Sequence, residues 1–264
     1  MSVKPHLPPG YHLVMVLPDL HIPYQDKAAI SCAMKTHEFV KPKRTVILGD
    51  WLDAEPFKTF EVRTLMEARA LDFKKDEIDP CNEVLDALQK NTSLVVYIEG
   101  NHEARIEKVA ARARGTGIGS VHSLISPRNL LSQGRKQFVW VPYSKSLSHY
   151  KITNDLWAFH GLSYSKHVAE THLNMLTSVS SVFGHVHRQQ SASRRCKATD
   201  KQIKAWSPGC LCERQPLWAA QMPTDWLHGF SLIYVKNDGS HWFEYTITIK
   251  DGICVLPGGK LIKG

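Results

Sequence analysis

The chain has 264 residues, of which 43% are hydrophobic and 22% charged, and its formal net charge is +8. This length allows one large domain with a full core, and the positive charge favours phosphate-bearing partners without establishing nucleic-acid binding. The six cysteines lack the dense, regular spacing of a disulfide-stapled secreted domain, residues 1–10 lack the apolar region of a signal peptide, and no run of about 18 apolar residues occurs. We therefore expect a cytoplasmic protein that is neither exported nor membrane-spanning.

Short apolar runs recur along the chain and predict the strands of an α/β fold. The predicted strands cover residues 11–17, 44–48, 94–98, 138–143, 151–160 and 178–183. Residues 26–40 carry apolar residues at helical spacing, which fits a βαβ crossover. Residues 61–90 are rich in Leu, Ala, Glu and Lys and are interrupted by Pro80, which predicts two helices. A basic helix over residues 104–114 and a flexible loop over residues 115–120 follow.

The C-terminal part of the chain predicts two more strands, within residues 230–249, around the turn signal Asn237-Asp238-Gly239. We expect residues 1–264 to form a single domain, with residues 230–264 as a C-terminal β extension packed on it.

Five of the predicted strands lead into a residue that can bind a metal ion. In open α/β sheets ligands gather beyond the carboxyl ends of the strands, so these separated residues can meet at one edge. Carboxylate oxygen and imidazole nitrogen suit the divalent ions that hydrolyse phosphate esters, and a bridging carboxylate holds two such ions. We expect Asp50 to bridge two ions, the first bound by Asp19, His21 and His187 and the second by Asn101, His160 and His185.

The order of the motifs resembles the calcineurin-like metallophosphoesterase family, most nearly its compact bacterial and phage members. The matching motifs are Asp19-Leu20-His21, Gly49-Asp50-Trp51-Leu52-Asp53, Gly100-Asn101-His102-Glu103, His160-Gly161 and Gly184-His185-Val186-His187. The resemblance implies a four-layer αββα β-sandwich of mixed sheets flanked by helices, and the ligand set just given. It also implies two divalent metal ions, with Mn favoured over Fe, Zn or Ni, and the hydrolysis of phosphomonoesters or phosphodiesters.

Catalysis in this scheme needs a hydroxide and a proton donor. Two cations that share a water lower its pKa toward neutrality, so a metal-bridging hydroxide can attack phosphorus. His102 resembles the family's histidine that assists the leaving group, and Asp53 could orient and charge its imidazole. Asp53 could instead be structural and pair with Lys58. We also expect His160, rather than His167, to be the ligand, since it directly ends an apolar run.

Several other residues have two interpretations. Arg105 could reach the substrate phosphate, and Trp51, Trp206 and Trp218 could stack on a base or sugar, although core packing is the commoner role of tryptophan. Glu103 is expected to be a helix-capping acid. Cys210 and Cys212 could bind metal or form a disulfide, but two small buried residues are the simpler interpretation.

The substrate class follows from what the motifs lack. Protein phosphatases of this superfamily carry phosphate-clamping arginines after the second motif and before the third, and this chain has neither. We therefore expect a phosphodiesterase acting on nucleic acid or nucleotides, with a phosphomonoesterase or a non-catalytic scaffold as alternatives. Two basic stretches could follow the backbone of DNA or RNA or could simply be solvated: Arg105, Lys108, Arg112 and Arg114, and Arg188, Arg194, Arg195 and Lys197. The sequence does not predict an oligomeric state.

Overall fold

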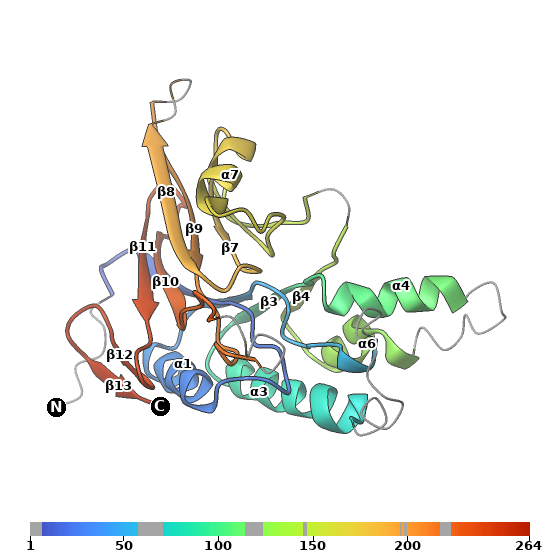
Figure 1. Ribbon diagram of the computed structural model, residues 1–264. Coiled ribbons are helices and arrows are strands. Elements are labelled where there is room, and N and C mark those ends of the chain that lie inside the picture. The colour runs from blue at the N-terminus through green and yellow to red at the C-terminus, as the bar shows by residue number, and fades with distance from the viewer. Residues whose placement is uncertain are drawn as a thin grey trace.

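Two mixed β-sheets with helices on their outer faces make up the computed structural model (Figure 1). It describes residues 7–57, 71–113, 124–144, 147–195, 197, 200–216 and 223–264. The predicted loop at residues 115–120 lies outside the described residues. Among the described residues, no helix combines the length and the apolar character needed to cross a membrane. The predicted α/β class and αββα layering are confirmed.

The first sheet has six strands in the order β11-β10-β1-β2-β3-β4. Its strands are β1 (Tyr11–Leu17), β2 (Arg44–Ile47), β3 (Leu94–Ile98), β4 (Phe138–Val141), β10 (Gly229–Lys236) and β11 (Trp242–Thr248). Strands β1 to β4 are parallel to one another, whereas β10 is antiparallel to β1 and to β11. The predicted hairpin around Asn237-Asp238-Gly239 therefore adds two strands to the sheet itself.

The second sheet has five strands in the order β5-β6-β7-β9-β8. Its strands are β5 (Tyr150–Thr153), β6 (Leu156–Phe159), β7 (Ser180–Phe183), β8 (Gln189–Arg195) and β9 (Gln202–Pro208). The single strand that we predicted over residues 151–160 is wrong, because a turn at Asn154-Asp155 divides this segment into the antiparallel β5 and β6. No strand was predicted over β8, whose exposed and polar sequence carries little hydrophobic signal. A small hairpin of β12 (Ile253–Val255) and β13 (Leu261–Lys263) completes the strands.

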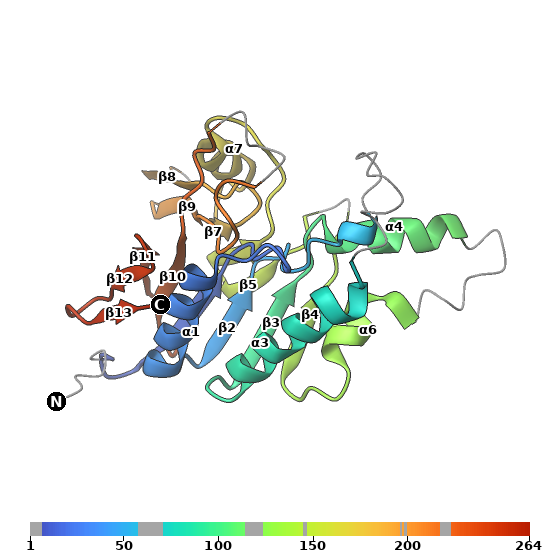
Figure 2. The same cartoon turned by 60° about the horizontal axis from the view of Figure 1, so that its bottom comes forward.

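The helices are α1 (Lys27–Val40), α3 (Asp79–Gln89), α4 (Glu103–Ala113), α6 (Pro127–Ser132) and α7 (Val168–Met175), with short turns η1 (Glu55–Phe57) and η2 (Phe73–Ile78). Four of the five α-helices in the described residues pack on the sheets, and the fifth, α4, extends away from them (Figure 1). Figure 2 shows α1 and α3 lying across strands β2 to β4. Helix α1 is capped at its N-terminus by Asp26, whose side chain accepts a hydrogen bond of 2.8 Å from Ala29 N. The helix forms the predicted crossover between parallel β1 and β2.

Pro80 lies beside the junction of two helical elements, η2 and α3. The π-helical turn η2 runs directly into α3, and Pro80 occupies the first turn of α3, where a missing N–H breaks no hydrogen bond. The remainder of the predicted helical region, residues 58–70, lies outside the described residues.

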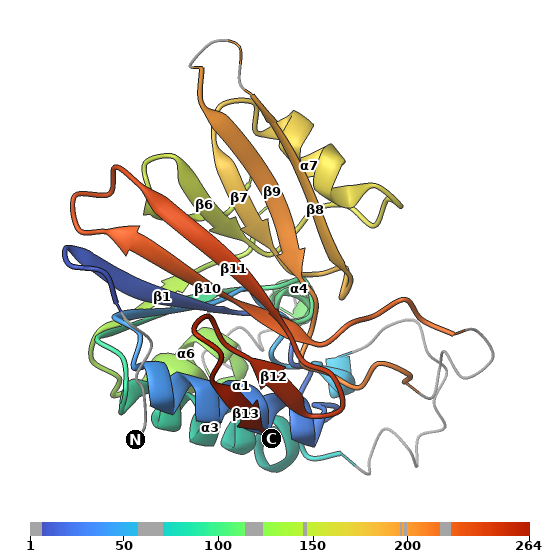
Figure 3. The same ribbon diagram turned by 90° about the vertical axis from the view of Figure 1, so that its left-hand side faces the viewer.

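The central strands are buried on both faces, which explains their continuous apolar sequence. Along β1, Met15 and Leu17 pack in the core beneath α1 and α3, whereas Val14 and Val16 pack between the two sheets. A third cluster joins the second sheet to α7 through Phe159, Phe183 and other residues. Figure 3 shows α1 and α3 on one side of the first sheet and the second sheet on the other.

Candidate metal centre

The candidate ligands meet where strands of both sheets end. Asp19 and Asp50 lie just beyond β1 and β2, and Asn101 lies beyond β3. His160 directly follows β6, and His185 and His187 follow β7. The structure thus brings together side chains up to 168 positions apart in the sequence, because parallel strands deliver their carboxyl ends to one edge.

The first group contains His21, His187 and Asp19. The Nε2 atoms of His21 and His187 lie 3.1 Å apart, and His187 Nε2 lies 3.4 Å from Asp19 Oδ1. All three residues are buried. Asp19 Oδ1 also accepts a hydrogen bond of 2.7 Å from His185 N, and Asp19 Oδ2 has no hydrogen-bond partner among the described residues. A buried carboxylate oxygen left unpaired is costly, and a cation at this point would satisfy it.

The second group contains Asn101, His160 and His185. His160 Nε2 lies 3.0 Å from Asn101 Oδ1 and 3.1 Å from His185 Nδ1. Asp50 joins the two groups, since its Oδ2 lies 3.2 Å from His160 Nε2 and 4.0 Å from His21 Nε2. One carboxylate oxygen between two sets of imidazoles has the position of a bridging ligand.

The hydrogen bonds behind the imidazoles leave lone pairs that point at one another. His21 Nδ1 donates to Asp53 Oδ1 at 2.9 Å, and His160 Nδ1 donates to the carbonyl of Leu48 at 2.7 Å, so Nε2 of each neutral ring is an acceptor. His160 Nε2 then faces the acceptors Asn101 Oδ1 and Asp50 Oδ2. Converging acceptors need a proton or a cation between them, and these N and O donors fit a divalent metal ion.

Electrostatics in the site follow the same pattern. Burial by itself raises the pKa of Asp50, but the neighbouring imidazoles of His102 and His160 hold it well below its usual range. Burial lowers the pKa of His160, yet the Asp50 carboxylate opposes it and brings the pKa to about 9. For His185, burial and the His160 charge lower the pKa to about 4. In the absence of metal, the ionised Asp50 therefore faces a proton on His160, and a divalent ion at this point would take the place of that proton.

The backbone is strained at the candidate ligands. His21, Asp50, His185 and His187 have φ values of 51°, 49°, 73° and 58°, in the left-handed region that residues with a Cβ rarely adopt. Such strain costs about 1–3 kcal/mol per residue and gathers at functional sites. Gly100 leaves the space that this arrangement needs, because a Cβ there would lie 2.1 Å from Asp50 Oδ1.

Glu103 supports the Asp50 loop, a role that the sequence analysis missed. Its buried carboxylate accepts hydrogen bonds from the backbone N–H of Asp50, Trp51, Leu52 and Gly100 at 2.8–3.1 Å, and from the Tyr97 hydroxyl at 2.7 Å. We expected a capping acid, and the contact with Gly100 N at the start of α4 agrees with that role. The other bonds show that Glu103 mainly anchors the strained loop. Its adjacency to Asn101 and His102 was the available signal.

His102, Asp53 and Arg105 lie together beside the first group. His102 Nδ1 lies 2.9 Å from Asp53 O and 3.2 Å from Asp53 Oδ1, and its Nε2 lies 3.0 Å from Arg105 Nη2 and 3.8 Å from Asp50 Oδ2. Although burial lowers the pKa of His102, the Asp50 and Asp53 carboxylates raise it above its usual value. The structure therefore places the expected partner, Asp53, on the ring nitrogen that faces away from Asp50.

The expectation that Trp51 stacks on substrate is wrong. Trp51 is fully buried in the core beneath the first sheet, and its Nε1 donates to the carbonyl of Pro18 at 3.1 Å. Trp206 is likewise buried, against Trp242, and Trp218 lies outside the described residues. Arg114, at the end of the first basic stretch, also lies outside them, as does the side chain of Arg112.

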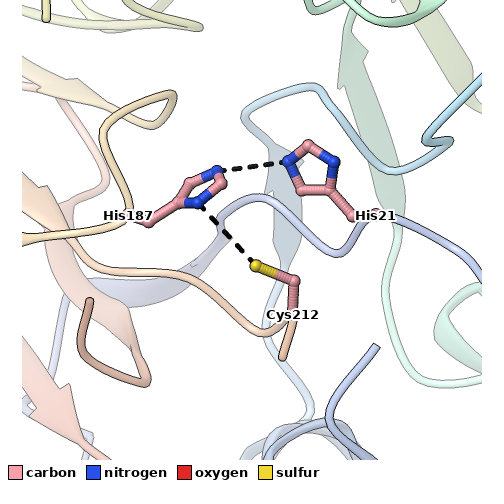
Figure 4. A group of neighbouring side chains, drawn as sticks. All are labelled: His21, His187 and Cys212. Atoms are coloured by element: carbon pink, nitrogen blue, oxygen red, sulfur yellow. Dashed lines mark hydrogen bonds between the residues drawn. The ribbon is translucent and has the colours of Figure 1, made fainter. Parts of the chain in front are cut away.

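Cys212 is a further buried neighbour of the first group. Its Sγ lies 3.9 Å from His187 Nδ1, the nitrogen opposite the one that faces His21 (Figure 4). Buried groups of His, Asp and Cys in this region could hold metal ions: His21 with His187 and Cys212, His21 with Asp50 and His102, and Asp50 with His160 and His185. Cys210 lies apart from them, with its Sγ 3.9 Å from the Cys212 carbonyl.

Comparisons with known proteins identify structural similarity at low sequence identity. Vacuolar protein sorting 29 from Cryptosporidium parvum has a TM-score of 0.50 and 16% identity, with 97% of this chain and 100% of that chain covered. A single mutant of Vps29 from Entamoeba histolytica has a TM-score of 0.47 and 13% identity over 96% and 99% of the two chains. TT1561 of Thermus thermophilus has a TM-score of 0.35 and 9% identity over 89% and 98%. No protein-family model and no curated protein matches the sequence.

Proposed function

We propose that this chain, which has the calcineurin-like metallophosphoesterase fold, is a phosphoesterase dependent on two divalent metal ions that hydrolyses phosphodiester bonds of nucleic acid or nucleotides. The observation that supports this best is Asp50 Oδ2, which lies 4.0 Å from His21 Nε2 and 3.2 Å from His160 Nε2, between the two proposed ligand groups. The buried Asp19 Oδ2, which has no hydrogen-bond partner among the described residues, adds an acceptor that a cation would satisfy.

In this proposal, each ion has three ligands of its own and shares Asp50. Asp19, His21 and His187 hold the first, and Asn101, His160 and His185 hold the second. Bound at these positions, two divalent ions would supply Lewis acidity toward phosphoryl oxygens and would lower the pKa of water to a value useful at neutral pH. Manganese is our first choice of ion, with iron, zinc and nickel as alternatives, because N and O ligands accept them all.

His102 is proposed to hold a proton for the leaving group. The Asp50 and Asp53 carboxylates raise its pKa, and Asp53 fixes the ring through Nδ1. Nε2 accepts from Arg105 Nη2 in this structure, so in the proposal it takes up its proton when that guanidinium turns to the substrate. Arg105 lies 3.0 Å from that Nε2, which supports a second proposal that its guanidinium contacts a phosphoryl oxygen.

The preference for a diester rests on missing arginines. Asp53-Ala54-Glu55 and Glu99-Gly100-Asn101 lack the cations that clamp a phosphate dianion in protein phosphatases. A phosphodiester carries one negative charge less than a monoester dianion and needs less compensation. A phosphomonoesterase remains the second candidate, which the same experiment separates.

The test is a substrate panel with metal analysis. Purified protein with Mn²⁺ is assayed on bis-p-nitrophenyl phosphate, p-nitrophenyl phosphate, and single- and double-stranded DNA, each repeated with EDTA. We expect diester hydrolysis that EDTA abolishes, two metal ions per chain, and loss of both in Asp50→Asn. Asp238→Asn, in an exposed turn, is the matched control. Preference for the monoester supports the second candidate, and two bound ions without any hydrolysis contradict an enzymatic function.

A further inference from the structure

An exposed tyrosine covers one side of the candidate metal centre. Tyr164 lies in the segment between β6 and α7, and its side chain is 70% exposed. Its ring centroid nevertheless lies 3.9 Å from that of His185, at an interplanar angle of 44°. One face of this ring therefore rests on a proposed ligand of the second ion, while most of the remaining surface faces solvent.

A tryptophan covers the other side. Trp226 lies in the segment before β10, is half-buried, and contacts His187 edge-on with ring centroids 4.1 Å apart. His187 belongs to the first group. Each half of the centre thus has one aromatic side chain in direct contact with one of its imidazoles.

Arg188 connects the two aromatic segments. It directly follows His187, and its Nη2 donates to the carbonyl of Ser165 at 2.8 Å while its Nη1 lies 3.4 Å from Asp225 Oδ2. Ser165 is the neighbour of Tyr164, and Asp225 is the neighbour of Trp226. Arg188, which belongs to the second basic stretch, therefore holds the two aromatic segments in place through these contacts and is not simply solvated.

We propose that Tyr164 and Trp226 form an aromatic rim that stacks on a nucleobase next to the scissile phosphate. The inference rests on the proposed phosphoesterase function and narrows its substrate class to nucleotides and nucleic acid. Stacking on aromatic side chains accepts any base, because every base has a π face, whereas a sugar phosphate without a base offers nothing to stack. The rim replaces Trp51, which is buried, as the stacking element.

Binding measured without turnover tests the rim. Calorimetric titration of the Mn²⁺-loaded protein compares adenosine 5′-monophosphate with ribose 5-phosphate, which has the same sugar and phosphate but a hydroxyl in place of the base. We expect the nucleotide to bind about tenfold more tightly, as stacking on one or two aromatic rings provides. Tyr164→Leu and Trp226→Leu should each remove most of this ratio while ribose 5-phosphate affinity changes little.

Matched variants separate stacking from loss of fold. Tyr164→Phe keeps the aromatic ring and should keep the affinity ratio between the nucleotide and ribose 5-phosphate. Tyr245→Leu removes an exposed tyrosine from β11, far from the centre in sequence, and should also leave this ratio unchanged. Equal affinity for both ligands in the natural protein overturns the rim even if diesters are hydrolysed. A nucleotide preference that needs both aromatics, in a protein that hydrolyses nothing, supports the rim and contradicts the proposed function instead.

Discussion

His21 Nε2 and His187 Nε2 lie 3.1 Å apart, although 166 positions separate the two residues in the sequence. Each ring is held from behind, His21 by Asp53 and His187 by the Cys212 sulfur. At this distance both Nε2 atoms can bind one cation placed between them, with Asp19 Oδ1 as a further ligand 3.4 Å from His187 Nε2.

His102→Asn should leave the metal content unchanged and reduce kcat by about 10²–10⁴, the usual contribution of a general acid. The reason is that His102 contacts Asp53 and Arg105, and the proposed two-ion arrangement uses His21 and Asp50, but not His102, as ligands. Metal analysis and steady-state kinetics on bis-p-nitrophenyl phosphate check this. His149→Asn, on a half-buried histidine that stacks on Trp157, serves as the control. Turnover equal to that of the natural protein would remove His102 from the mechanism.

Cys212→Ala should weaken binding of the first metal ion, the one that His187 is proposed to hold, by about tenfold, because partners of the non-coordinating nitrogen orient a histidine ligand. The contact between Cys212 Sγ and His187 Nδ1 is the structural basis. Competition with a fluorescent chelator measures the affinity. Cys210→Ala removes a neighbouring buried thiol without that contact and should leave the affinity unchanged. Equal losses in the two variants would point to packing as the cause.

Glu103→Gln should lower the free energy of unfolding by about 2–5 kcal/mol. The buried Glu103 carboxylate accepts five hydrogen bonds. A glutamine amide at this position would turn its own N–H groups toward some of those donors. Urea denaturation of the metal-free protein measures the loss. Glu83→Gln, on the exposed face of α3, should change stability by less than about 0.5 kcal/mol. A Glu103→Gln variant as stable as this control would show that the loop needs no anchor.

Glu77 should make stability depend on pH. Its buried carboxyl contacts the backbone N–H groups of Ala54 and Glu55, and burial raises its pKa from 4.5 to about 8. Between these values the folded protein keeps a proton that the unfolded chain releases, so stability falls as pH rises through this window, by at most about 1.4 kcal/mol per pH unit. Below pH 4.5 and above about pH 8 the contribution of Glu77 no longer changes.

The difference in unfolding free energy between the natural protein and Glu77→Gln isolates this contribution, because all other groups titrate in both. We expect the natural protein to lose stability relative to the variant as the pH is raised from about 5.5 to about 8.5. Parallel stability curves over that range would show that the pKa of Glu77 is not raised.

The positions of the first sheet's central strands, and the candidate metal-binding residues that follow them, could be predicted from the sequence. Tyr11–Leu17 and Leu94–Ile98 are continuous apolar runs because both faces of these strands are covered, and burial on both faces is a local property of the sequence. The residues after them, Asp19 and Asn101, gather at one edge because parallel strands share a direction. The second sheet was harder to predict, since β8 is exposed and polar and the turn at Asn154-Asp155 interrupts what looked like one strand.

Residue identity and order determined which side chains could bind metal ions, because donor chemistry belongs to the amino acid itself. Only the tertiary structure decided how each imidazole is held, since that depends on contacts with Asp53, Leu48 and Cys212 made across long stretches of chain. It also decided that Trp51 is core and that Tyr164 lies against the centre, because exposure depends on what other segments cover. The local sequence determines which chemical groups a residue can offer, and tertiary packing determines which other groups that residue contacts.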